Sequence, residues 1–161
     1  MVRPDATGDA TMEMTGSRKI AAPRERVWNA LNDPAVLKDC IPGCEEMTGS
    51  PEDGFEAIVK QKVGPVKATF KGAVVLKHVV PPESYRIEGE GKGGVAGFAK
   101  GGADVRLVEV PEGTELSYAV DAKVGGKIAQ LGGRVVDSIA TRMADEFFER
   151  FKDRVEGGGA A

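Results

Sequence analysis

The chain has 161 residues, of which 41% are hydrophobic and 29% are charged, and its formal net charge at pH 7 is −3. This length suits a single soluble domain that buries a core without disulfide or metal support. The lack of a basic excess argues against nucleic-acid binding, and no apolar run approaches the roughly 18 residues that cross a bilayer.

Both ends of the chain differ in composition from the middle. Residues 1–11 carry few large apolar side chains, so we expect a flexible leader and not a secretory signal peptide, which needs an apolar core. Residues 157–161 are glycine and alanine and are expected to form a flexible tail. The folded domain is predicted over residues 12–156, in a reducing cytoplasm where Cys40 and Cys44 stay as thiols.

The first predicted elements are a strand and two short helices. Residues 12–20 are strand-like, and Pro23 then suits the first turn of a short helix. Asp33 can cap a second short helix, which the Ile-Pro-Gly sequence at residues 41–43 ends.

Residues 45–124 change to a period of two, in which apolar and polar side chains alternate. Turns rich in proline and glycine separate these runs, as expected for an antiparallel meander that is dry on one face and wet on the other. The residues predicted on the dry face include Phe55, Ala57, Ala68, Phe70, Gly72, Val74, Leu76, His78, Tyr85, Ile87, Val105, Leu107, Leu116, Tyr118, Val120 and Ala122.

The last segment returns to helical spacing. Apolar side chains recur every three or four residues over 127–155, which predicts one continuous helix about 43 Å long. Its apolar stripe is expected to lie across the dry face, where each buried large side chain contributes about 1.5–3 kcal/mol. The stripe consists of Ile128, Leu131, Val135, Ile139, Met143, Phe147 and Phe151, widened by Val136, Ala140, Ala144 and Phe148.

Two consecutive predicted strands carry almost no side chains at the hairpin end that they share. Because protein interiors are close-packed, this predicts either a hollow for a ligand beneath the helix or a sharp bend of the sheet around the helix. The small residues on the dry-face phase are Gly89, Gly91 and Gly93 in one strand and Ala99, Gly101 and Ala103 in the next.

Three other features suggest chemistry but lack the context that it needs. The sequence at residues 89–94 matches G-x-G-x-x-G, yet no βαβ unit surrounds it, so dinucleotide binding is rejected. Cys40, Cys44 and His78 fall short of the four ligands of a zinc site, and no serine or carboxylate is placed to make His78 a general base. We therefore expect no metal site and no catalytic residue, with the cysteines at the cavity mouth and His78 at its rim.

Several segments resemble the CoxG family of carbon monoxide dehydrogenase subunits, and the likeness covers about residues 12–151. The most specific of these segments are the Ile-Pro-Gly-Cys and Gly-Phe-Ala-Lys-Gly sequences. The matching segments are Met14-Thr15-Gly16-Ser17-Arg18-Lys19-Ile20, Leu31-Asn32-Asp33-Pro34, Cys40-Ile41-Pro42-Gly43-Cys44-Glu45, Lys62-Val63-Gly64-Pro65-Val66, residues 89–102 and residues 125–132.

That resemblance implies an α+β helix-grip fold of the START-like (SRPBCC) superfamily. Such a fold wraps a curved antiparallel β-sheet of about six to seven strands around one long C-terminal helix, with two short helices after the first strand. The family is linked to molybdenum-containing carbon monoxide dehydrogenases and related hydroxylases, which implies such an enzyme as the partner. Its proposed roles are recruitment of the enzyme to the inner face of the membrane or the handling of a lipophilic electron acceptor such as a quinone. Many relatives continue into a C-terminal linker and an apolar anchor, which this sequence lacks, so a soluble or peripheral protein is expected.

The main hypothesis is a non-catalytic binding protein that holds a quinone or another lipid between sheet and helix, with no covalent cofactor. One alternative is an assembly factor that grips the enzyme through an exposed patch at Phe147, Phe148 and Phe151. The other is a cyclase-type enzyme that uses His78 or Tyr118. The residues predicted to line the cavity are Trp28, Leu37, Ile41, Phe70, Val74, Gly89, Gly91, Ala99, Gly101, Tyr118, Leu131, Val135 and Ile139.

Overall fold

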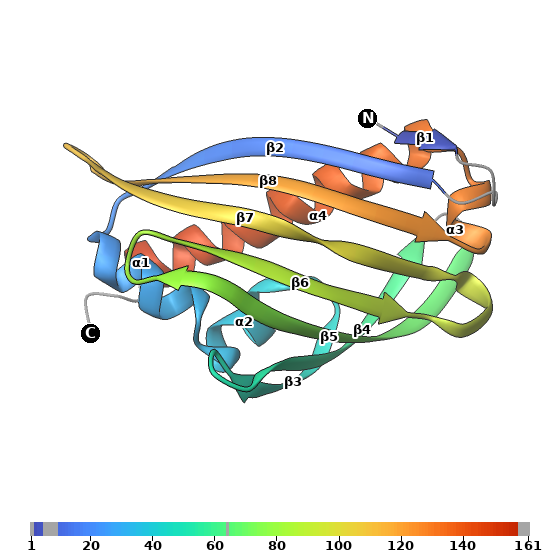
Figure 1. Cartoon of the computed structure of the whole chain (residues 1–161), viewed down its shortest axis with the longest axis horizontal. Coiled ribbons are helices and arrows are strands. Elements are labelled where there is room, and N and C mark those ends of the chain that lie inside the picture. The colour runs from blue at the N-terminus through green and yellow to red at the C-terminus, as the bar shows by residue number, and fades with distance from the viewer. Residues whose placement is uncertain (1, 5–9, 64, 158–161) are drawn as a thin grey trace.

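A curved antiparallel sheet dominates the computed structural model, which describes residues 2–4, 10–63 and 65–157 (Figure 1). Within these residues, eight strands lie in the order β1-β2-β8-β7-β6-β5-β4-β3. From β3 to β8 each strand pairs with the next in the chain, so the predicted meander is confirmed. The strands are β1 (Val2–Pro4), β2 (Ala10–Ile20), β3 (Cys44–Ser50), β4 (Gly54–Val63), β5 (Val66–Val80), β6 (Ser84–Lys92), β7 (Phe98–Val110) and β8 (Gly113–Gly125).

The additional strand lies in the segment that was expected to be a leader. Val2–Pro4 pairs antiparallel with the first three residues of β2, which begins at Ala10. This short strand extends the edge of the sheet. It brings the number of strands to eight, above the six to seven that were expected. Residues 1, 5–9 and 158–161, which include most of the expected tail, lie outside the described part of the chain.

Two short helices connect β2 to β3, as predicted. Helix α1 (Arg24–Leu31) follows Pro23, whose fixed φ suits the entry into a helix. Helix α2 (Pro34–Cys40) begins after Asp33, whose carboxylate accepts a hydrogen bond of 2.9 Å from the backbone N–H of Ala35. Both helices close one end of the concave face of the sheet (Figure 1).

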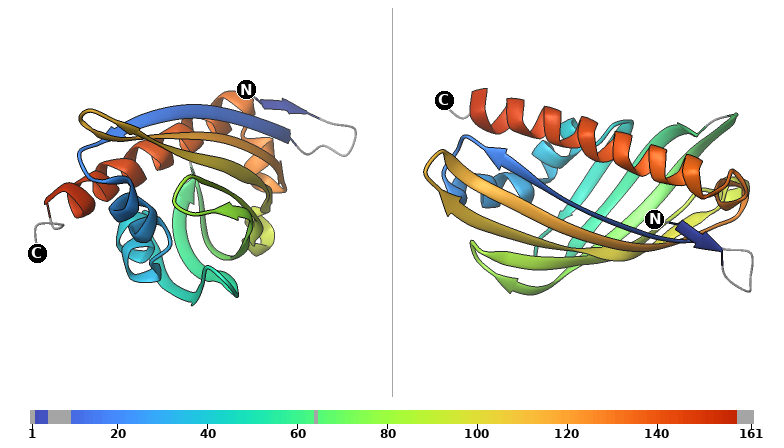
Figure 2. Two further views of the ribbon diagram at one scale, coloured as in Figure 1. Left: turned by 60° about the vertical axis from the view of Figure 1, so that its left-hand side comes forward. Right: turned by 90° about the horizontal axis from the view of Figure 1, so that it is seen from above.

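The C-terminal helical region is broken, where the sequence predicted one helix over 127–155. A short helix α3 (Lys127–Gln130) is followed by α4 (Gly133–Lys152) and by a π-helical turn, η2 (Asp153–Gly157). The break lies at Gly132, whose φ of +96° is a left-handed conformation that glycine adopts without strain. Helix α4 alone is about 30 Å long and runs diagonally across the concave face of the sheet (Figure 2).

The buried face of α4 is rotated by about one residue from the predicted stripe. Val136, Phe148 and Phe151 are buried, whereas Val135, in the centre of the predicted stripe, is 40% exposed. Phe147 is partly buried and contacts both of its aromatic neighbours. The three phenylalanines at 147, 148 and 151 therefore face the interior and do not form the exposed aromatic patch expected of an assembly factor.

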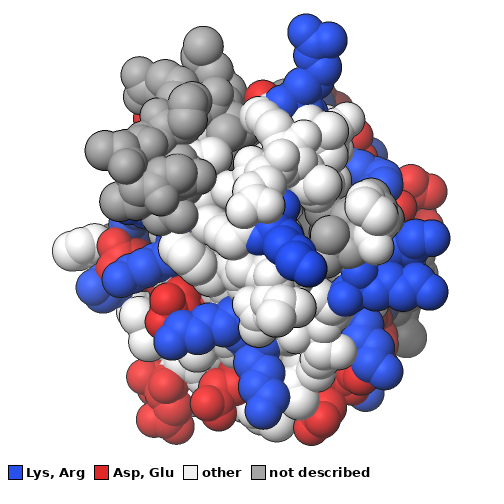
Figure 3. Space-filling view, turned by 90° about the vertical axis from the view of Figure 1, so that its right-hand side faces the viewer, with Lys and Arg blue, Asp and Glu red and all other residues white. Residues whose placement is uncertain are grey.

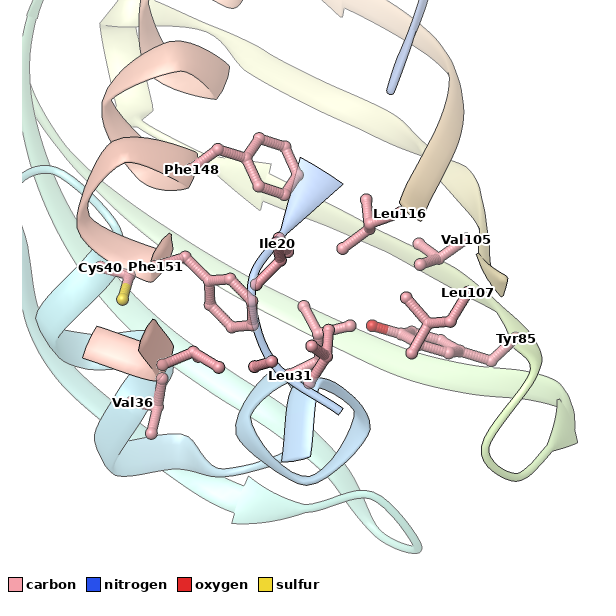
Figure 4. Packing of buried hydrophobic residues seen from close by; sticks show 13 residues of the cluster. Ile20, Leu31, Val36, Cys40, Tyr85, Val105, Leu107, Leu116, Phe148 and Phe151 are labelled. Carbon is pink, nitrogen blue, oxygen red and sulfur yellow. The ribbon is translucent and has the colours of Figure 1, made fainter. Parts of the chain in front are cut away.

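Two hydrophobic clusters hold α4 to the sheet, one near each of its ends. The larger cluster joins α1, α2 and the C-terminal end of α4 to the sheet through residues such as Ile20, Leu116 and Phe151 (Figure 4). The smaller one joins Met12 and Val124 to Val136, near the N-terminal end of α4. The helix is thus held against the sheet near both of its ends.

Ion pairs bind neighbouring strands together on the convex face. The guanidinium of Arg86 on β6 lies 2.9 Å from the carboxylate of Glu88, 3.0 Å from that of Asp104 and 3.1 Å from that of Asp121. Lys77 on β5 lies 2.6 Å from Glu88. The network thereby spans β5 to β8, and these pairs raise the pKa of Arg86 and lower that of Glu88 to about 2.

None of the described helices combines the length and apolar character that crossing a bilayer requires.

Candidate functional site

An apolar cavity of about 360 Å³ lies between the concave face of the sheet and the middle of α4. This volume falls within the range of about 300–1,000 Å³ that is typical of small-molecule sites. Among the described residues that form its wall, only Tyr85 and Tyr118 carry a polar side-chain oxygen. The wall consists of Met14, Leu31, Leu37, Ile41, Met47, Phe55, Ala57, Gly72, Val74, Leu76, Tyr85, Ile87, Ala103, Val105, Leu116, Tyr118, Val120, Ala144, Phe147 and Phe148.

The period-two alternation explains which strand residues reach the wall. Register pairs Phe55 of β4 with Val74 of β5, and Val105 of β7 with Tyr85 of β6 on one side and Tyr118 of β8 on the other. These residues share the concave face because paired residues of adjacent strands point to the same side. Small residues open space between them, and these are Ala57, Gly72, Ala103 and, on α4, Ala144.

Four of the residues predicted to line a cavity meet in this wall. Leu37 and Ile41 come from α2 and the turn after it, while Val74 and Tyr118 come from β5 and β8. Segments far apart in the sequence therefore converge on one space, as the alternation and the short helices together predicted.

The predicted glycine-rich residues line a second hollow of about 310 Å³. Gly89 and Gly91 of β6 and Ala99 and Gly101 of β7 all belong to it, towards the hairpin end of these strands. This hollow adjoins the cavity, since both are bordered by Gly72, Val74, Ile87, Ala103 and Val120.

The sequence left two roles open for these glycines, a bend of the sheet and a hollow for a ligand. Different glycines of the second hollow fill each role. A Cβ on Gly89 would lie 2.2 Å from the backbone oxygen of Ala73, and one on Gly101 would lie 2.1 Å from that of Asp121. These two glycines permit a close approach of neighbouring strands. A Cβ on Gly91 would instead have its nearest neighbour at 3.9 Å, so this position leaves open space.

Two predicted wall residues pack beside the hollows rather than in their walls. Trp28 of α1 makes an edge-to-face contact with Tyr85, with 5.2 Å between the ring centroids, and so supports a wall residue from behind. Phe70 of β5 lies against Gly93, where a Cβ would come within 2.4 Å of its ring. The aromatic ring of Phe70 thus fills the space that the missing side chain of Gly93 leaves.

Leu131, Val135 and Ile139 also lie outside the walls of both hollows. The reason is the geometry of the helix. Leu131 ends α3, before the break at Gly132, and the rotation of α4 turns Val135 towards solvent. The helix lines the cavity further along, through Ala144, Phe147 and Phe148.

Three further wall residues lie on the predicted dry face, although they were not among the residues predicted to line the cavity. Tyr85, Ile87 and Leu76 stand on the predicted dry-face phase, and the structure places all three in the wall. Met14 of β2 and Met47 of β3 had no comparable signal, because their strands do not alternate cleanly in sequence.

A polar contact joins the sheet to α4 beside the cavity. The Arg18 guanidinium donates hydrogen bonds of 3.2 Å to the hydroxyl of Tyr118 and of 2.7 Å to the carboxylate of Asp145. It also lies 5.0 Å from the ring centroid of Phe148, which stacks on Tyr118. The hydrogen bond with Tyr118, and then that with Asp145, raises the pKa of Arg18, which keeps its charge.

His78 and the two cysteines lie away from the cavity wall. His78 is exposed at an irregularity of β5 and borders a shallow polar depression with Arg86, Asp104 and Arg106. Cys40 is buried in the larger hydrophobic cluster, and Cys44 donates to the backbone oxygen of Glu46 at 3.2 Å, so neither lines the cavity mouth. Burial raises the pKa of both thiols.

The end of the molecule that carries α3 and the β6–β7 connection has a largely uncharged centre surrounded by basic and acidic side chains (Figure 3). Val95, in the turn η1 (Gly94–Ala96) of that connection, is 82% exposed. The exposed Lys92 and Lys127 belong to the same end of the fold. Among the described residues, no group of three or more histidine, cysteine, aspartate or glutamate side chains is placed to hold a metal ion.

The model of the CoxG family of carbon monoxide dehydrogenase subunits matches residues 16–156. A conserved protein from Geobacillus kaustophilus is 28% identical, with a TM-score of 0.84 over 91% of this chain and 96% of that one. A protein from Rhizobium leguminosarum is 14% identical, with a TM-score of 0.70 over 92% and 96% of the two chains. Ara h 8.0201, a Bet v 1-type allergen, is 9% identical, with a TM-score of 0.65 over 91% and 99%. The helix-grip fold is thereby confirmed, and no match was found among curated proteins.

Proposed function

Because the chain belongs to the CoxG family of carbon monoxide dehydrogenase subunits, we propose that it is a non-catalytic protein that binds an apolar small molecule, a quinone or another lipid. The observation that carries the proposal is the cavity of about 360 Å³ under α4, whose wall is apolar except for two hydroxyl groups. Burial of apolar ligand surface in such a space contributes about 25 cal/mol per Å² of area removed from water.

A binding role fits the wall better than a catalytic one. Acid–base and nucleophilic chemistry need converging polar groups within hydrogen-bond reach of the substrate. Of the two residues assigned to the enzyme alternative, His78 lies outside the cavity, and Tyr118 has no acidic or basic side chain beside it in the wall.

The family name supports the partner. We propose that the protein serves a molybdenum-containing carbon monoxide dehydrogenase, or a related hydroxylase, as an accessory subunit in the cytoplasm. The proposal includes peripheral contact with the inner face of the membrane through the end that carries Val95. An exposed apolar side chain with lysines nearby favours an anionic lipid surface.

A matched pair of substitutions tests the binding function. Ala103 on β7 lines the cavity, whereas Ala119 on β8 is exposed on the convex face. Ala103→Phe should fill the space and lower the affinity for the fluorescent probe 1-N-phenylnaphthylamine at least about tenfold, because the probe loses the volume that it occupies. Ala119→Phe should leave the affinity unchanged.

Probe fluorescence is measured by titration on both variants and on the parent protein, with circular dichroism to show that each is folded. Equal binding by all three proteins would place the probe elsewhere and contradict the proposal. Native mass spectrometry of the gently purified protein should in addition show an apolar molecule at a stoichiometry of about one.

A further inference from the structure

Tyr85 brings an unused hydroxyl into the apolar cavity. The residue is 4% exposed and belongs to the cavity wall. Figure 4 shows its hydroxyl oxygen pointing inward from β6 towards Leu31 of α1. Among the described residues, none forms a hydrogen bond with this hydroxyl, and the residue packs in the larger hydrophobic cluster.

Tyr118 is the other residue of the cavity wall that carries a hydroxyl group. The chain has two tyrosines, and both stand in the wall. The hydroxyl of Tyr118 accepts a hydrogen bond from Arg18, which fixes its oxygen beside α4 and leaves only its proton for a ligand. The hydroxyl of Tyr85 has no such partner among the described residues, so both its oxygen and its proton are free to meet a ligand in the cavity.

The protein holds this hydroxyl in one place. Trp28 packs edge-on against the Tyr85 ring, with 5.2 Å between the centroids. In the sheet, Tyr85 is paired with Val105, which is itself paired with Tyr118. Burial raises the pKa of the phenol, so the group keeps its proton and can donate it in a hydrogen bond at physiological pH.

We propose that the ligand of the cavity is an apolar molecule that carries a hydrogen-bond-accepting oxygen, such as a carbonyl, and that Tyr85 donates to that oxygen. This inference rests on the proposed binding function and adds the specificity of the site. A ligand oxygen would satisfy the unpaired donor, whereas a hydrocarbon of the same shape would leave it unpaired. Sites built around such a donor discriminate against analogues that lack the acceptor.

The test compares two probes of nearly the same shape. Menadione and 2-methylnaphthalene share a methylated two-ring skeleton, but only menadione carries carbonyl oxygens. Their affinities for the full chain and for Tyr85→Phe are measured by equilibrium dialysis. For each probe, the dissociation constant of the variant is divided by that of the parent protein. The water solubility of the probe enters both constants equally, so it cancels in this ratio.

For menadione, Tyr85→Phe should weaken binding about three- to tenfold, as expected for the loss of one hydrogen bond. For 2-methylnaphthalene the affinity should stay equal or improve. Tyr118→Phe tests the other phenol of the wall: if Tyr85 is the donor, this variant should change the two affinities to the same extent.

Three outcomes would overturn the inference. Equal losses of affinity for both probes in Tyr85→Phe would show that Tyr85 only shapes the cavity and donates no hydrogen bond to the ligand. Discrimination lost in Tyr118→Phe but kept in Tyr85→Phe would assign the donor to Tyr118. A melting temperature of ligand-free Tyr85→Phe clearly below that of the parent would reveal a structural hydrogen bond, since removal of an unpaired hydroxyl should not destabilise the fold. Failure of both probes to bind the parent protein would instead contradict the binding function itself.

Discussion

At the scale of single residues, glycines on the same face of the sheet differ in what surrounds them. Gly89 faces the backbone of β5 so closely that no side chain fits, whereas Gly91, two residues further along β6, faces open space. Their roles are therefore different. Gly89 permits the curvature of the sheet, and Gly91 helps to keep the second hollow open.

The two glycines make a matched pair for substitution. Gly91→Ala should stabilise the protein by about 0.5–1 kcal/mol, because alanine restricts the unfolded chain and its Cβ would make only an ordinary contact, 3.9 Å from the backbone oxygen of Lys71. Gly89→Ala should destabilise it by about 1–3 kcal/mol, because the Cβ would overlap the backbone oxygen of Ala73. Urea unfolding measures both changes, and a loss of stability of the same size in both variants would contradict this assignment.

The two thiols are expected to differ from free cysteine in reactivity. Burial raises the pKa of Cys40 and of Cys44, so less of each is present as the reactive thiolate at pH 8. Cys40 is also 1% exposed, so it should react with iodoacetamide only when the protein opens. Mass spectrometry over time should show Cys44 modified first and Cys40 last; rapid modification of Cys40 in the folded protein would be inconsistent with its burial.

At the scale of secondary-structure elements, the strands and α4 are joined by polar contacts at the surface as well as by the core. Arg18 links β2 to Asp145 of α4, and the network around Arg86 links β5 to β8. Exposed ion pairs of this kind contribute little individually. They nevertheless set how the stability of the sheet depends on pH.

The carboxylate of Glu88 should make the fold sensitive to acid. Its hydrogen bonds with Lys77, and then with Arg86, lower its pKa to about 2 in the folded protein, from an ordinary value of 4.5. A lowered folded-state pKa gives stability that is present above about pH 4.5 and is lost as the pH falls towards 2. The melting temperature of Glu88→Gln should therefore fall less than that of the parent between pH 5 and pH 2.5.

Glu115→Gln supplies the control for this measurement, since Glu115 of β8 lies outside the ion-pair network of Lys77, Arg86 and Glu88. Its melting temperature should decline with acid as steeply as that of the parent. A Glu88→Gln variant that declines as steeply as the parent would show that the network does not couple folding to pH.

At the scale of the whole molecule, the fold combines a packed core at each end of α4 with a hollow beneath its middle. The larger cluster closes the end formed by α1 and α2. The second hollow extends towards the opposite end, which carries α3 and the turn with Val95. That end is where we propose that the protein meets a lipid surface.

Val95→Glu should weaken binding to anionic phospholipid vesicles by at least several-fold. The substitution removes an exposed apolar side chain and adds a charge that an anionic surface repels. Val75→Glu is the matched control, because Val75 is 46% exposed but lies in β5, outside the proposed contact. Vesicle sedimentation measures both, and equal effects of the two substitutions would argue against contact through η1.

Much of the fold could be predicted from local pattern. The alternation in residues such as Phe55, Val74 and Tyr118 determined which face of each strand is buried, because side chains of a strand point alternately to its two faces. The spacing of apolar residues after residue 127 likewise identified a helix that must cover that face. Two of the residues in the cavity wall, Val74 and Tyr118, follow from the alternation, while Leu37 and Ile41 come from the short helix α2 and the turn after it.

The amino-acid sequence by itself determined the strands, the face that each one buries and the presence of a covering helix, because these depend on periodicity and on turn residues. Only the tertiary structure decided the orientation of that helix. Neighbouring apolar residues such as Val135 and Val136 widen the apolar stripe of α4, so the sequence allows either of them to be buried. Packing of the two hydrophobic clusters at the ends of α4 buries Val136 and leaves Val135 exposed. The position of the cavity follows from the same choice. The helix contributes Ala144, Phe147 and Phe148 to the cavity wall because this edge of its stripe is the one that faces the sheet.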